Sequence, residues 1–166
     1  MSIVRADSIR TSQEAAPIPL TELQQRVIKT YRNSYRGGSW EASDAYQWLP
    51  AGYHDYTPAS ASSRIRFSLN LSYAHTDGHA IAHCIFYANG VEQGKHSIAG
   101  QSPEHRHLYV WDVPSWGLTE GRIGYQVRRY GGSNRPRFHG THHWNGAGSN
   151  QNAQSEIVIE EYIPIS

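Results

Sequence analysis

The amino-acid sequence predicts an all-β protein, an antiparallel β-sandwich of jelly-roll type behind an extended N-terminal arm. Three observations predict this fold class: about eight short segments with strand character follow one another at regular spacing, turn residues separate them, and no segment has the period of a long helix. At 166 residues the chain has room for one core. We therefore expect an attachment arm over residues 1–35 and one sandwich domain over residues 36–166.

The arm is predicted from its prolines and from its lack of a hydrophobic period. Pro17 and Pro19 lack backbone donors and prevent a helix through this stretch. Thr21 and Gln24 then indicate a helical turn that passes into a strand at VIKTY, residues 27–31. Apolar side chains without a sustained period cannot form a core alone, so we expect the following ones to dock on a partner surface: Ile3, Val4, Ile9, Ile18 and Leu20.

The middle of the chain carries the clearest strand signals. Large aromatic residues between turn residues over 39–58 indicate short strands. In RIRFSLNLSYA, residues 64–74, every second residue from Ile65 to Tyr73 is apolar, which is the pattern of a half-buried strand. Asn89-Gly90 is the strongest two-residue hairpin signal, and it joins an apolar strand to a polar one that we expect at a sheet edge.

The last third of the chain supplies the remaining strands. HRHLYVWDV (105–113) and RIGYQVRRY (122–130) are expected to pair or to face each other, with Trp111 and Tyr125 in or beside the core. A short strand in PRFHGTHHW (136–144) precedes a low-complexity loop. The final strand, EIVIEEYIP, has four alternate residues on one face: Ile157, Ile159, Glu161 and Ile163.

Composition and charge exclude several classes of protein. The formal net charge is only +1 and charges of both signs are spread along the chain, so nucleic acid is not an expected partner. The longest uncharged apolar run, residues 80–88, is far shorter than the roughly 20 residues of a membrane span. Arg5, Asp7 and Arg10 stand where a secretory signal has its apolar core, so we expect synthesis in the cytoplasm. The lone Cys84 is expected to be a small core residue.

Ten histidines raise the question of a metal site, and we expect none. His75, His79 and His83 are close in sequence, but Asp77-Gly78 is itself a turn signal that separates them. His105 and His107 point to the same side of an extended chain, and three copies around a three-fold axis would supply six nitrogens to an octahedral metal. A solvated strand face explains the same pair and is the preferred interpretation.

Candidate binding residues come from the aromatic and histidine side chains of turn-rich segments. With only 38% hydrophobic residues, a subunit interface would supplement the core, and the exposed tryptophans suit either such an interface or a recognition surface. Trp116 lies in one turn-rich segment. His142, His143 and Trp144 lie in another, where they would stack on a sugar or a partner surface, and a loop tip without a ligand explains them equally well.

Patterns for catalysis are missing from the sequence. No Gly-x-Ser-x-Gly elbow occurs, and Glu160 and Glu161 point to opposite faces of one strand. Gly37-Gly38 and Gly131-Gly132 lack the helix and lysine of a phosphate loop. We therefore expect no enzyme activity and no cofactor.

Several stretches resemble virion proteins of tailed phages. The opening SIVRADSIRTSQEAAPIPL resembles the leader of appendage proteins of aquatic tailed phages, and three later stretches are similar to the C-terminal domains of cyanophage structural proteins: HAIAHCIFYANGVEQGKHSI, SPEHRHLYVWDVPSWG and IGYQVRRYGGSNRPRFHGTHHW. The resemblance implies a tail fibre or appendage protein on the virion. It also implies a homotrimer whose leader docks on other virion proteins of the tail, baseplate or capsid, while the β domain projects for host attachment.

Three other functions stay open at this point. A capsid decoration, or cement, protein has the same arm and sandwich. A carbohydrate-binding module would bind a glycan, such as one on a host surface, through exposed tryptophans. A metal-dependent enzyme would use His75, Asp77, His79 and His83.

Overall fold

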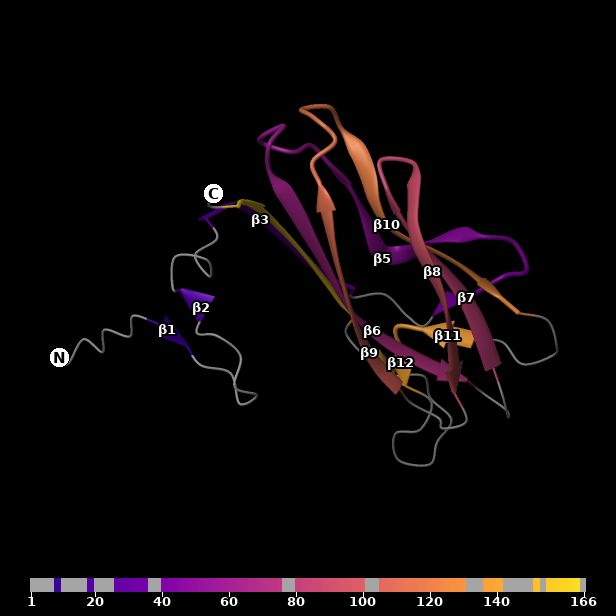
Figure 1. The fold of residues 1–166 in the computed structure, drawn as a ribbon. Helices are drawn as coiled ribbons and strands as arrows, with labels where there is room; N and C mark the ends of the chain where they lie inside the picture. The colour runs from indigo at the N-terminus through magenta and orange to yellow at the C-terminus, as the bar shows by residue number, and fades with distance from the viewer. Residues whose placement is uncertain are drawn as a thin grey trace.

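The computed structural model describes residues 8–9, 18–19, 26–35, 40–75, 80–100, 105–130, 136–141, 151–152 and 155–164. The ordered elements in these ranges are strands, and every strand pairing is antiparallel, which confirms the predicted fold class. The described ranges contain no helix long and apolar enough to cross a membrane. Two facing sheets form the body of the molecule (Figure 1).

One layer is a four-stranded sheet and the other is a six-stranded sheet. Across the four-stranded sheet the order is β5 (Gln47–Tyr56), β10 (Gly121–Arg129), β7 (Ala80–Ala88) and β8 (Val91–Gly100). In the six-stranded sheet, β9 (His105–Pro114) pairs with one side of β6 (Arg64–His75), and β14 (Glu156–Ile163) and β11 (Pro136–Phe138) pair with successive parts of its other side. On one side the outer positions belong to β3 (Arg26–Ser34) and β4 (Trp40–Glu41), and on the other side β9 is the outer strand.

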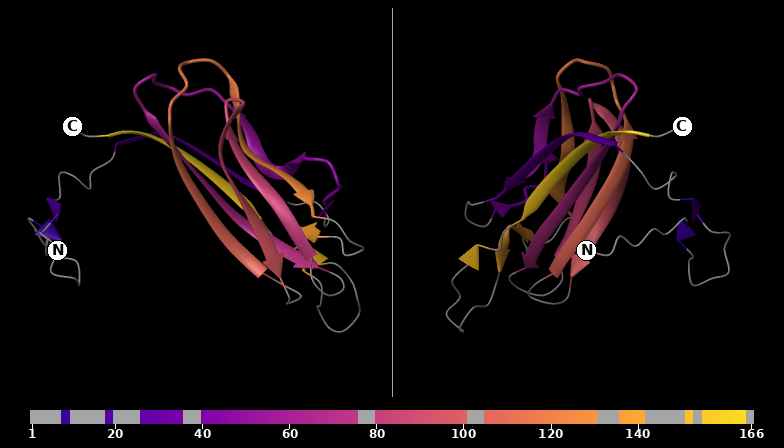
Figure 2. Two further views of the ribbon diagram at one scale, coloured as in Figure 1. Left: turned by 45° about the vertical axis from the view of Figure 1, so that its right-hand side comes forward. Right: turned by 90° about the vertical axis from the view of Figure 1, so that its left-hand side faces the viewer.

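The pairing is that of a jelly roll. Strand β7 pairs with β8, β6 with β9, β5 with β10 and β3 with β14, so each pair encloses the previous one along the chain. Such nesting is a long antiparallel ribbon that has been rolled into two layers. Two views of the ribbon show the layers from the side and from the face of the six-stranded sheet (Figure 2).

Two further antiparallel ladders each join a pair of two-residue strands. β1 (Ser8–Ile9) pairs with β2 (Ile18–Pro19), and β12 (Gly140–Thr141) pairs with β13 (Gln151–Asn152). The strand predicted at residues 27–31 is part of β3, which pairs with β14. These residues were predicted to belong to the arm over residues 1–35, but they are part of the sandwich. The helical turn predicted at residues 21–24 lies outside the described residues.

The core lies between the sheets and is filled largely by aromatic rings. Alternate side chains of β6 from Ile65 to Tyr73 are at most 1% exposed, as their period predicted. Phe67 meets Phe86 of the opposite sheet with ring centroids 5.1 Å apart. The predicted strands at 105–113 and 122–130 face each other across the core, where the Trp111 indole nitrogen donates a hydrogen bond to the Tyr125 hydroxyl.

Two local predictions are confirmed by backbone geometry and burial. Asn89 and Gly90 have φ angles of 50° and 77°, the left-handed conformation of a tight hairpin turn, and the polar strand β8 that follows is an edge strand. Cys84 is 1% exposed. On β14, Ile157 and Glu161 are fully buried, whereas Ile163 is only partly buried.

Candidate functional site

Trp116 is the one predicted binding residue within the described ranges. It is partly buried and packs against the core, with its ring 6.4 Å from the ring of Tyr56. Its indole nitrogen donates a 3.1 Å hydrogen bond to the backbone oxygen of Thr119, which fixes the loop between β9 and β10. Trp116 therefore contributes to the packing of this loop. His142, His143 and Trp144 lie outside the described residues.

The histidines considered as metal ligands are placed on different layers. His83 lies on β7, with its ring 4.8 Å from Tyr130 and its Nδ1 3.5 Å from the Arg128 guanidinium. His107 lies on β9 in the other sheet and stacks on Tyr109. The structure describes the backbone of His75 and His105 and leaves out their side chains, and His79 is not described. Within the described residues, no group of three or more potential ligands surrounds a common point.

The candidate attachment residues lie almost entirely beyond the described ranges. Ile9 and Ile18 are register partners in the β1–β2 ladder. Ile3, Val4 and Leu20 are not described. Their role in attachment stays a prediction.

An aromatic cluster occupies the outer face of the four-stranded sheet. Strand β5 has an irregularity opposite β10, because Tyr53 pairs with Gly124 whereas Trp48 pairs with Gln126. This brings Trp48 next to Tyr53, with ring centroids 5.4 Å apart, and Trp48 also contacts Tyr87 at 5.9 Å. We define these three rings as the aromatic cluster.

Gly124 makes this arrangement possible. It lies between Tyr53 and Tyr87 in the ladder, and Trp48 contacts both of these neighbours. Its φ angle is +143°, and a Cβ atom at this position would lie 2.4 Å from the backbone oxygen of Gly52. Only glycine combines this conformation with so close an approach of the two strands.

A charged pair lies against the aromatic cluster. Arg122 donates hydrogen bonds of 2.6 and 2.8 Å to the two carboxylate oxygens of Asp55. Its guanidinium lies 4.6 Å from the ring centre of Tyr53 and 5.3 Å from that of Trp48, within the range of cation–π contacts. The hydrogen bond from Arg122 lowers the pKa of the Asp55 carboxyl. The guanidinium and the carboxylate are therefore held in a fixed orientation beside the rings.

These groups border an open depression of about 410 Å³. Its lining residues are Trp48, Asp55, Glu120, Gly121 and Arg122. An aromatic ring beside oriented charged groups can stack on a ligand and accept hydrogen bonds from it. Trp48 is one of the large aromatic residues of segment 39–58, which the sequence assigned to short strands. Asp55 and Arg122 were missed, because they meet only through the register of β5 with β10.

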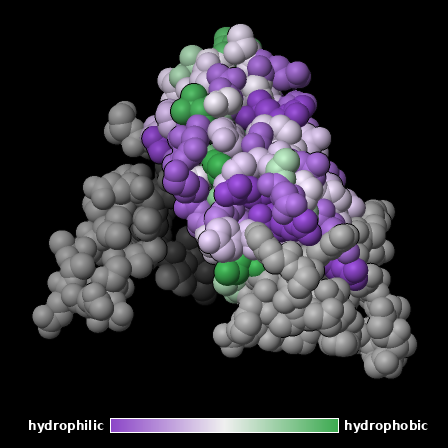
Figure 3. Space-filling view, turned by 90° about the vertical axis from the view of Figure 1, so that its right-hand side faces the viewer, coloured by the Kyte–Doolittle hydropathy of each residue, from purple (hydrophilic) through white to green (hydrophobic). Residues whose placement is uncertain are grey.

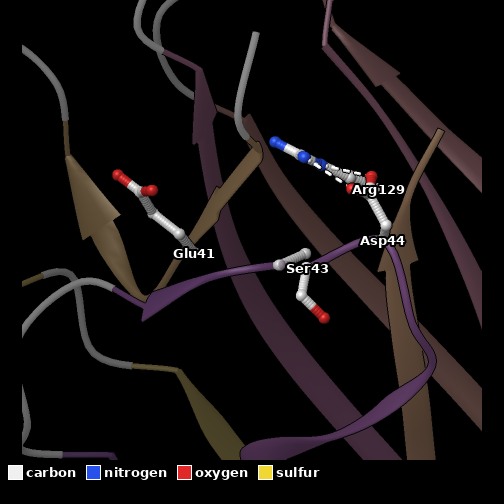
Figure 4. A pocket seen from close by; sticks show the side chains of 5 residues that line it. Glu41, Ser43, Asp44 and Arg129 are labelled. Atoms are coloured by element: carbon white, nitrogen blue, oxygen red, sulfur yellow. Dashed lines mark hydrogen bonds and ion pairs between the residues drawn. The ribbon is translucent and has the colours of Figure 1, made fainter. Parts of the chain in front are cut away.

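A second pocket of about 270 Å³ lies at the start of β5 and contains only paired or locally bonded polar groups (Figure 4). Arg129 points at Asp44 and forms a two-point ion pair with it, and Glu41 forms an ion pair of 2.7 Å with Arg137. The Ser43 hydroxyl donates a 3.1 Å hydrogen bond to the backbone oxygen of Ala45 within a turn. These contacts fix the chain locally and present no serine paired with a base.

The outer face of the six-stranded sheet carries exposed apolar side chains. Leu108 and Val110 of β9 are 70% and 54% exposed, and they stand opposite the uncharged Asn70 and Ser68 of β6. Val158 of β14 stands on the other side of Ser68. We call these five residues the β9 face.

Charged residues of both signs surround the β9 face. Register places four of them on the same outer surface: Arg32, Arg106, Glu156 and Glu160. None of these four joins an ion pair with another described residue of the chain. By contrast, the side of the molecule where β7 and β8 lie is mostly hydrophilic, with small separate apolar patches (Figure 3).

No protein-family model matches the chain, and no curated protein matches it in sequence. Solved structures with some similarity include that of Bacillus endospore appendages, described as a novel family of disulfide-linked pili, at 9% identity and a TM-score of 0.38 over 84% of this chain and 91% of the other. Another is the VP2 subviral particle of infectious bursal disease virus, at 10% identity and a TM-score of 0.35 over 97% of this chain and 46% of the other.

A third is dimeric latent PorU from Porphyromonas gingivalis, at 7% identity and a TM-score of 0.38 over 96% of this chain and 14% of the other. The chain thus spans less than half the length of the last two proteins. Two of the three come from assemblies, the pili and the subviral particle. Similarity at this level carries no argument about function.

Proposed function

We propose that this protein is a structural component of a virion, of tail fibre or appendage type, that assembles with copies of itself. The proposal is supported by the β9 face. Leu108 and Val110 stand side by side on one strand with more than half of their surface in water, and contiguous exposed apolar groups of this kind are typical of interaction surfaces. A second copy of the chain is the occupant that suits this face best.

Charge supports a second copy as the partner. The β9 face is uncharged at its centre, and its rim carries two arginines and two glutamates that form no ion pair within the described part of the chain. An apolar centre can pack against a different surface of a neighbouring copy, with the rim charges of both signs pairing across the contact, and such a head-to-tail contact can close into a ring. The resemblance of the sequence to phage appendage proteins favours three copies per assembly.

The remainder of the proposed function follows the division of the chain. The residues before β3 dock on another virion protein, and the sandwich projects for host attachment. Such a role needs binding surfaces and neither a reaction nor a cofactor.

Self-assembly is tested by light scattering coupled to size exclusion. We expect the full chain to have three times the mass of one chain. Leu108→Ser combined with Val110→Ser should yield a folded monomer. Leu118→Ser is the matched control, because Leu118 is 63% exposed but lies in the loop between β9 and β10. A monomeric wild-type protein would overturn the proposal, as would an unchanged mass for the double variant.

Attachment is tested by deleting residues 1–22, which leaves β3 and all later strands intact. We expect the truncated chain to fold and to be absent from purified virions. Its incorporation at the wild-type level would refute docking by the arm. The copy number per particle separates an appendage, present in few copies, from a capsid decoration protein.

A further inference from the structure

The depression on the four-stranded sheet has the composition of a sugar site, and we infer that it binds a neutral hexose of a surface glycan. The inference rests on the proposed function for the source of the glycan, because host attachment requires a ligand on a cell surface. It adds the site and the chemistry of the ligand. The groups that carry it are Trp48, Asp55, Glu120 and Arg122.

Trp48 supplies the stacking surface. Its ring is held between Tyr53 and Tyr87 and lines the depression. An indole held by its neighbours loses little conformational entropy when a ligand covers it, which makes it suited to binding. The C–H groups on one face of a pyranose ring are the kind of apolar surface that such an aromatic ring accepts.

The carboxylates of the depression accept hydrogen bonds, so they suit a ligand whose hydroxyl groups donate them. Each Asp55 oxygen accepts one bond from Arg122, and an ionised carboxylate oxygen has two lone pairs, so both oxygens keep capacity for a second bond. Glu120 is exposed on the rim and forms no ion pair with another described residue. Two carboxylates beside one guanidinium leave a net negative charge. The depression therefore suits a neutral sugar and disfavours sialylated or sulfated ones.

The size and place of the depression agree with this ligand. Its volume of about 410 Å³ lies within the range of roughly 300–1,000 Å³ that small-molecule pockets occupy. It lies on the four-stranded sheet, whereas the β9 face lies on the other layer of the sandwich. Assembly through the β9 face would leave the depression in contact with solvent.

The test uses the full chain and methyl glycosides of glucose, galactose and mannose, titrated by calorimetry and by NMR, with an array of neutral, sialylated and sulfated glycans beside them. We expect at least one neutral hexoside to bind and charged glycans to bind more weakly. Trp48→Ala should weaken binding about tenfold. Glu120→Gln should weaken it about fivefold with a nearly unchanged melting temperature, since Glu120 is exposed and forms no hydrogen bond or ion pair with another described residue.

The controls separate this site from others. Trp40→Phe alters a tryptophan of β4 that packs against the core from the other sheet, and it should leave hexoside affinity unchanged. The inference is overturned if wild-type protein binds no neutral hexoside, if it prefers sialylated glycans, or if Trp48→Ala and Glu120→Gln both bind like wild type. Protein that assembles and enters virions but binds no hexoside contradicts this inference alone. Protein that binds hexosides as a monomer contradicts only the proposed assembly.

Discussion

Tyr56 donates a 2.9 Å hydrogen bond to the fully buried carboxylate of Glu161, 105 residues further along the chain. The same carboxylate accepts bonds from the backbone of Ala59 and Ser60 and from the Ser63 hydroxyl. Glu161 of the six-stranded sheet thereby holds the end of β5 and the loop that leads from one sheet to the other. Burial alone would raise the pKa of Glu161, but these donors outweigh it and lower the pKa.

Replacement of this carboxylate is expected to destabilise the fold. In Glu161→Gln an amide nitrogen faces groups that are themselves donors, so at least one buried hydrogen bond is lost and another donor is left unsatisfied. We expect a loss of about 2–4 kcal/mol in the free energy of unfolding, measured by urea denaturation. Glu160→Gln, on the neighbouring half-exposed residue, should change it by less than about 0.5 kcal/mol. Equal stability of the two variants would contradict the role of Glu161.

His139 gives stability a dependence on pH. It is fully buried, follows β11 and packs against Tyr35, with the two ring centroids 4.1 Å apart. Burial lowers the pKa of His139 from 6.5 to about 4, although the nearby Pro50 carbonyl opposes the shift. The folded protein therefore binds fewer protons than the unfolded chain between these values. The stability contributed by neutral His139 is present above pH 6.5 and is lost as the pH falls toward 4.

We expect that loss to be at most about 3 kcal/mol, measured as the change in unfolding free energy between pH 7 and pH 4. His139→Asn should flatten the dependence between pH 6.5 and 4.5, and asparagine tolerates the positive φ of 63° at this position. An identical pH profile for wild type and variant would show that His139 is not responsible. Below about pH 4.5, protonation of Glu161 is expected to add a further loss.

Gly124→Ala tests the close approach of β10 and β5. The added Cβ would lie 2.4 Å from the Gly52 oxygen, so we expect a destabilisation of at least about 2 kcal/mol and a changed near-ultraviolet signal from Trp48. Gly90→Ala is the control, since it has a positive φ of 77° but nothing within 4 Å, and should cost only about 1 kcal/mol. A smaller effect at Gly124 than at Gly90 would contradict this account.

Cys84 should be unreactive in the folded protein. Burial raises the pKa of its thiol to about 12, so the thiolate is scarce at neutral pH, and the side chain is only 1% exposed. We expect a thiol reagent to modify less than about 5% of the protein in an hour at pH 7.5, and all of it in guanidinium chloride. Rapid labelling of native protein would show that the core opens at β7.

Sequence periodicity predicted the strands but not their partners. The alternation from Ile65 to Tyr73 specifies which side of β6 is buried, because a strand places successive side chains on opposite faces. It says nothing of whether β9 or β10 pairs with β6. A local turn signal such as Asn89-Gly90 determines only the pairing of the two strands that it joins, here β7 and β8.

The contacts of the candidate site could not be predicted from the sequence either. Trp48 and Tyr87 are 39 positions apart, and their contact depends on Gly124 in a third strand. Asp55 and Arg122 are ordinary surface charges in the sequence and become a fixed pair only when β5 and β10 align. The alternation of β14 put Glu161 on its buried face, yet the donors that make this burial possible come from the β5–β6 loop.

The nesting of strand pairs has a mechanical consequence. Strands β3 and β14 form the outermost pair, with Arg26 opposite Ile163, so the arm leaves the sandwich at the place where the last strand ends. If the arm is the tether, a force applied between the arm and the far end of the sandwich is transmitted along β3. The hydrogen bonds between β3 and β14 would then be loaded together in shear, the geometry in which a β ladder resists force best, and would not open one after another.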